Sequence, residues 1–157
     1  MRQTFDRRSV LGLAVGSAAG AMFVSSAKPS YAAGTTYKAA MDGASEVPPT
    51  TSTGKGAATV TYDAATKTVT WEGDFSGLSG PATAAHIHGP AEAGKNAGVI
   101  VPLSQAGTPF TSPFKGSATL ADDKAAALAA ALSGGQAYVN VHTAANPGGE
   151  VRGQLKS

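Results

Sequence analysis

Three histidines are the residues of this sequence best suited to chemistry. His86 and His88 are separated by one residue, His142 lies far downstream, and the chain has no other histidine. Both segments have β-strand character, and residues two apart in a strand point to the same face. We therefore expect His86 and His88 to project together, with Ile87 on the opposite side. Neutral imidazole binds copper, zinc, iron and nickel, so this cluster predicts a metal site.

A three-histidine site would differ from a structural zinc site. Three protein ligands leave a coordination position open, as catalysis or substrate binding requires. The chain has no cysteine, which excludes disulfides and thiolate ligands, and the usual affinity order favours Cu(II). The predicted metal is therefore copper, with zinc as the alternative. In the competing structural interpretation, His86 and His88 hydrogen-bond across a loop, and His142 pairs with Glu150.

Four residues of the last two strand-like segments are candidates for the surroundings of a bound ion. Asn140 and Tyr138 share a strand face with His142, where Asn140 could orient a ligand and Tyr138 could form an aromatic wall. Glu150 could accept a ring N–H and so fix a histidine tautomer. Arg152 could attract a small anion such as superoxide. The ordinary alternatives are core packing, a turn hydrogen bond, a surface carboxylate and an ion pair.

Short strand-like segments alternate with turns along the rest of the chain. One helix is expected to begin at Asp122 or Asp123, either of which can cap it, and to end at Gly134-Gly135. The overall pattern predicts an all-β fold, an antiparallel β-sandwich with one short helix. About seven or eight strands are expected, over residues 36–41, 57–62, 67–75, 82–88, 99–103, 114–120, 138–143 and 150–155.

The first 32 residues have the features of an export signal. Arg7-Arg8 belongs to a twin-arginine pattern, an uncharged run over residues 10–27 follows, and Ser30-Tyr31-Ala32 is typical of a cleavage site. We expect removal after Ala32, which leaves a single domain of residues 33–157 without a membrane anchor. Export by the twin-arginine route would place this domain in the periplasm or outside the cell.

Removal of the signal changes the charge of the protein. The full chain has a formal net charge of +2, whereas residues 33–157 keep seven Lys and one Arg against five Asp and four Glu, a net charge of −1. This balance excludes a nucleic-acid or anionic-membrane surface. The sequence contains no Gly-x-Ser-x-Gly elbow, phosphate-binding loop or His-Glu-x-x-His motif, which excludes the enzyme classes that those motifs define.

Several segments resemble the CHRD, or chordin-type, domain family. They are Glu46-Val47-Pro48-Pro49, residues 84–90 with Asn96, Gly98 and Val101, and the closing runs 138–143 and 146–155. The resemblance implies an extracytoplasmic β-sandwich-like domain. The family takes its name from modules of an animal signalling antagonist, and those animal domains suggest an interaction or scaffold role. A second resemblance is limited to a short motif. The His-x-His spacing is similar to that in the copper strand of copper/zinc superoxide dismutases, which are also β-sandwiches.

Three functions compete on the sequence alone. A copper enzyme would dismute superoxide at the open position of the three-histidine site. A non-catalytic periplasmic copper-binding protein would hold the ion without turnover. A metal-independent protein-interaction module would not use the histidines as ligands, and the sequence identifies no protein partner for it.

Overall fold

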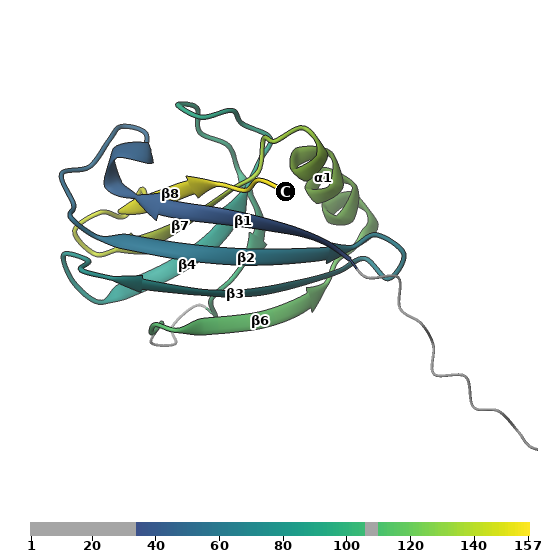
Figure 1. Cartoon of the computed structure of the whole chain (residues 1–157), viewed down its shortest axis with the longest axis horizontal. Helices are drawn as coiled ribbons and strands as arrows, with labels where there is room; N and C mark the ends of the chain where they lie inside the picture. The colour runs from purple at the N-terminus through teal and green to yellow at the C-terminus, as the bar shows by residue number, and fades with distance from the viewer. Residues whose placement is uncertain (1–33, 106–109) are drawn as a thin grey trace, which may run out of the picture. The chain divides into compact units, whose positions relative to one another are not determined.

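The part of the chain that the structure describes contains eight strands and one α-helix. Figure 1 shows how these elements are arranged. The computed structural model describes residues 34–105 and 110–157, and the predicted export signal lies outside these residues. A short 3-10 helix, η1 (Gly43–Ser45), follows the first strand, and the α-helix, α1 (Asp122–Ser133), precedes the seventh. The strands are β1 (Thr35–Asp42), β2 (Lys55–Asp63), β3 (Thr68–Ser76), β4 (Ala82–His88), β5 (Val99–Pro102), β6 (Phe114–Thr119), β7 (Tyr138–Thr143) and β8 (Val151–Gln154).

All eight strands belong to one sheet with the order β5-β4-β7-β8-β1-β2-β3-β6. Every pair of neighbouring strands in it is antiparallel. The prediction of an antiparallel all-β fold with seven or eight strands and one helix is confirmed. The two layers of the sandwich are halves of one continuous sheet, which curls because neighbouring strands twist against each other.

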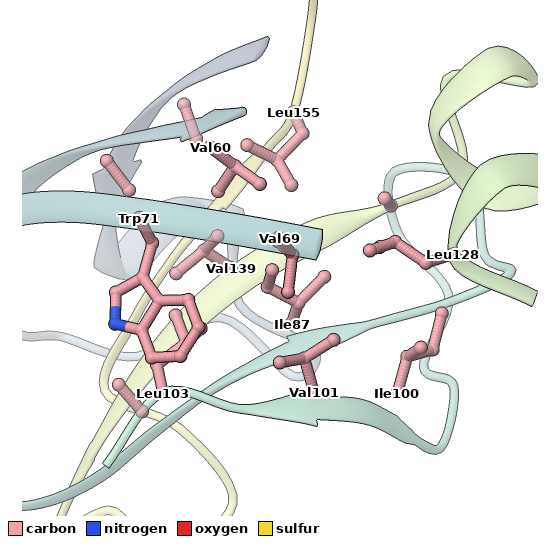
Figure 2. Close-up of a cluster of buried hydrophobic side chains, with 14 of the residues drawn as sticks. Val60, Val69, Trp71, Ile87, Ile100, Val101, Leu103, Leu128, Val139 and Leu155 are labelled. Carbon is pink, nitrogen blue, oxygen red and sulfur yellow. The ribbon is translucent and has the colours of Figure 1, made fainter. Parts of the chain in front are cut away.

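The hydrophobic core fills the inner side of this curled sheet. Side chains from opposite halves meet there, such as Val69 and Trp71 of β3 with Ile87 of β4 and Val139 of β7 (Figure 2). Alternation along each strand sends every second side chain into this core. The intervening side chains of β4 and β7, which include the histidines, must therefore lie on the outer face.

Helix α1 packs against the core through Leu128 and Leu132, which are buried. The predicted capping role of Asp122 or Asp123 is wrong. Ala121 occupies the N-cap without a side-chain hydrogen bond, and the two acids lie in the first turn, where negative charge is stabilised by the helix dipole. The predicted end is confirmed, since Gly135 has a φ of 64° just after the helix.

No helix in residues 34–105 and 110–157 has the length and apolar character needed to cross a membrane.

Candidate metal centre

The three histidines come from two strands, β4 and β7, that are neighbours in the sheet. The core residues Ile87, Val139 and Val141 point to the inner face, so strand alternation places the histidines on the outer face. The antiparallel register pairs Ala84 with His142, His86 with Asn140, and His88 with Tyr138.

The imidazole rings lie close enough to share one ion. His86 Nδ1 is 3.0 Å from His142 Nε2, and one ring nitrogen from each of the three histidines lies within 4.8 Å of the other two. Bonds of about 2 Å from a tetrahedral ion place its nitrogen ligands roughly 3.3 Å apart. Small rotations of the side chains therefore suffice to bring three nitrogen atoms to one metal. The predicted grouping of His86, His88 and His142 is confirmed.

Backbone carbonyl groups set the tautomers of two of these rings. His88 Nδ1 lies 2.9 Å from the carbonyl oxygen of Ala97, and His142 Nδ1 lies 3.0 Å from that of Pro147. A carbonyl oxygen only accepts hydrogen bonds, so each Nδ1 carries the proton and donates it. The Nε2 lone pair of each ring is then available for a metal, in the arrangement typical of metal-binding histidines.

Burial keeps the three imidazoles in the neutral form that binds metals. Burial, together with the charge that His142 and His88 would carry, lowers the pKa of His86 to about 4. Burial also lowers the pKa of His88 and of His142, although their hydrogen bonds to carbonyl groups act in the opposite direction. At neutral pH the site therefore offers uncharged nitrogen ligands.

Tyr138 forms an aromatic wall beside His88. The two rings stack with a centroid distance of 4.9 Å and an interplanar angle of 4°. The guanidinium carbon of Arg152 lies 3.4 Å from the centroid of the Tyr138 ring. Because β4 and β8 flank β7 in the sheet, Tyr138 lies between His88 and Arg152.

Arg152 is 1 % exposed and holds the loop between β4 and β5. Its guanidinium donates hydrogen bonds to the carbonyl oxygens of Lys95 (2.9 Å) and Glu92 (3.4 Å) and to the Asn96 side chain (3.2 Å). The same loop contains Ala97, whose carbonyl group orients His88. The geometry therefore makes Arg152 a support for the centre, and its role in attracting an anion stays a prediction.

Glu150 is completely buried and organises the turn that follows His142. Its carboxylate accepts hydrogen bonds from the hydroxyl groups of Ser52 (2.6 Å), Ser79 (2.6 Å) and Thr143 (2.5 Å), and from the backbone N–H of Ser79 (2.6 Å). Burial alone would raise its pKa, but these hydrogen bonds outweigh burial and lower the pKa to about 2. Glu150 thus fixes the turn that carries Pro147, while Pro147 itself orients His142.

A buried carboxylate that the sequence reasoning missed lies beside Asn140. Glu46 is 4 % exposed, its Oε1 has no hydrogen-bond partner within residues 34–105 and 110–157, and burial raises its pKa. A Cβ atom on Gly149 would clash with Glu46 Oε1 and lie 2.7 Å from Asn140 Nδ2, so these groups meet at one point. The only signal for Glu46 is the Glu46-Val47-Pro48-Pro49 segment, which the sequence predicts as a loop.

Comparison with known proteins identifies the family. No curated protein and no solved structure shows a significant match to the sequence. The family model described as the CHRD domain matches residues 37–155, a span that runs from β1 beyond the end of β8 and includes the three histidines. The chain belongs to the CHRD domain family.

Proposed function

We propose that this protein binds one copper ion through His86, His88 and His142. The observation that carries the proposal is the convergence of three neutral imidazoles, with ring nitrogens within 4.8 Å of one another. Hydrogen bonds to Ala97 and Pro147 leave Nε2 of His88 and His142 unprotonated. Nε2 of His88 has no partner among the described residues, and Nε2 of His142 lies 3.0 Å from His86 Nδ1, a hydrogen bond that a bound ion would replace.

A purely structural role accounts less well for these histidines. His88 does hydrogen-bond to Ala97 in the loop after β4, as this interpretation expects. The pairing of His142 with Glu150 that it also requires is replaced by a hydrogen bond from His142 Nδ1 to the Pro147 carbonyl group. His88 Nε2 is buried and has no hydrogen-bond partner among the residues that the structure describes. Buried polar atoms usually find a partner, and a metal ion would supply one.

The donor chemistry favours copper over zinc. The three histidines supply nitrogen ligands, cysteine is absent from the whole chain, and the affinity of such a donor set peaks at Cu(II). The predicted twin-arginine signal would export the domain to the periplasm or beyond, and membership of the CHRD family fits an exported protein.

Dismutation of superoxide is the second candidate function. His86 is only partly buried, unlike His88 and His142, so the cluster has one edge that a small molecule can reach. Arg152 is buried and stacks on the Tyr138 ring, so its positive charge is poorly placed to attract superoxide toward the centre. Copper-loaded protein should exceed free copper in superoxide dismutation, and activity no greater than that of free copper would leave metal binding as the function.

A competition titration against a copper chelator tests the proposed binding. We expect one equivalent of copper per chain, and we expect the paired substitutions His86→Ala and His88→Ala to weaken binding by at least about 100-fold, because outer-shell changes alone cost 10- to 100-fold. Glu72→Ala is the matched control, since it removes an exposed carboxylate from β3. Equal affinity of the wild-type and double-variant proteins would contradict the proposal and favour the interaction module.

A further inference from the structure

Two buried acceptor atoms without hydrogen-bond partners belong to neighbouring residues of the metal centre. Within residues 34–105 and 110–157, His88 Nε2 and Asn140 Oδ1 are both buried, and neither has a partner. Asn140 lies directly opposite His86 in the β4–β7 pair, is the diagonal neighbour of His88, and shares a strand face with His142. Asn140 is therefore a neighbour of all three histidines on the outer face of the sheet.

The groups around the Asn140 side chain determine how its amide is oriented. Its Nδ2 donates a hydrogen bond to the Gly148 carbonyl oxygen at 3.5 Å, and both this nitrogen and Glu46 Oε1 border the space where a Cβ atom on Gly149 would lie. The acceptor on that side requires the NH2 group there, since a carbonyl group would be repelled by it. The Oδ1 atom is thereby directed away from it.

His88 cannot satisfy this oxygen in its neutral form. Its single ring proton is on Nδ1 and is donated to Ala97, so Nε2 presents a lone pair. Asn140 Oδ1 also presents lone pairs, and two acceptors do not bond to each other. A cation bound between the two atoms would satisfy both.

We propose that Asn140 Oδ1 is a fourth protein ligand of the ion, alongside His86, His88 and His142. This inference rests on the proposed metal binding and deepens it. The buried Glu46 carboxyl group lies beside Asn140 and is not part of the cluster of three histidines. A donor set of three nitrogens and one hard oxygen suits Cu(II), whereas Cu(I) prefers soft sulfur ligands. Such a donor set favours the divalent ion.

The test compares two substitutions at this position in the full protein. Asn140→Leu removes the oxygen at similar volume, and Asn140→Asp keeps an oxygen at the same place. Gln136→Leu is the matched control, because it replaces an amide with the same leucine away from the centre. Affinity is measured by Cu(II) titration against a chelator, and the ligand set is measured by Cu(II) electron paramagnetic resonance.

We expect Asn140→Leu to bind Cu(II) at least about tenfold more weakly than wild type and to change the g and hyperfine values of the spectrum. We expect Asn140→Asp to keep the affinity within a few-fold of wild type, because a carboxylate oxygen replaces the amide oxygen. Unchanged spectroscopic values in Asn140→Leu, with or without weaker binding, would overturn the inference. Asn140→Asp that binds as weakly as Asn140→Leu would overturn it as well. Absence of Cu(II) binding by the wild-type protein would instead overturn the proposed function.

Discussion

Among individual residues, Ala97 and Pro147 orient two imidazoles of the centre through their carbonyl oxygen atoms. Each accepts a hydrogen bond from Nδ1 and directs Nε2 toward the outer face of the sheet. A backbone carbonyl group is present at every residue, so no residue type in the sequence reveals which carbonyl groups do this. The histidine pair itself was predictable, because strand alternation alone places His86 and His88 on one face.

Gly149 is the residue whose substitution should disturb the centre most simply. Its φ of 131° is unfavourable for other residues, and a Cβ atom there would clash with Glu46 and crowd Asn140. We expect Gly149→Ala to lower the free energy of unfolding by about 1–3 kcal/mol and to weaken copper binding. Urea denaturation and the chelator titration measure both effects.

Gly148→Ala is the control for this prediction. A Cβ atom at Gly148 would meet no atom within 4 Å, so we expect its stability and copper affinity to stay close to wild type. Equal effects of the two substitutions would show that the contacts around Gly149 are not important.

Among the structural elements, the loops between the strands support the three histidines. Arg152 of β8 anchors the β4–β5 loop. The Glu150 carboxylate accepts hydrogen bonds from the side chains of Ser52, Ser79 and Asn146, which lie in the loops before β2, β4 and β8. Asn96 adds a hydrogen bond from its side chain to the carbonyl oxygen of Val47 at 2.9 Å, which links two loops over the outer face. These contacts join segments far apart in the sequence, so local patterns do not reveal them.

Arg152→Lys separates anchoring from charge. Lysine keeps the positive charge but lacks the planar fork, whose Nη1 reaches the Asn96 side chain while Nη2 reaches the Lys95 carbonyl oxygen. We expect a lower thermal midpoint and copper binding weakened by roughly 10-fold, as for the loss of an outer-shell support. A Lys variant with wild-type stability and affinity would instead support the predicted role of Arg152 as a source of positive charge.

One curled sheet with two differently used faces describes the whole molecule. Its inner face holds the hydrophobic core (Figure 2), and its outer face over β4, β7 and β8 holds a second, polar interior. Alternating polarity in the sequence predicts the strands and the single helix well. The continuity of the sheet and the burial of Glu46 and Glu150 depend on long-range contacts, so local sequence patterns do not predict them.

The pH dependence of stability is a property of the whole metal-free protein. The pKa of His86 falls from 6.5 to about 4 on folding, so the unfolded chain binds more protons in this range. We expect the free energy of unfolding to be fully retained above pH 6.5 and to decrease as the pH falls toward 4. Glu150, with a pKa lowered from 4.5 to about 2, extends the loss below pH 4.5.

Urea denaturation of the metal-free protein between pH 7.5 and pH 4 measures this dependence. The His86→Ala variant should lose less stability than wild type over the same range, because it lacks the group that takes up the proton. A wild-type stability that does not change between pH 7 and pH 5 would contradict the assignment of neutral, buried imidazoles.

Cu(II) electron paramagnetic resonance of the protein loaded with one equivalent of copper tests the central claim most directly. The account predicts nitrogen superhyperfine structure from three imidazoles, with fewer coupled nitrogens when either His88 or His142 is replaced by alanine. A spectrum of hydrated copper, or one that is identical in the wild-type protein and both variants, would contradict a metal centre at His86, His88 and His142.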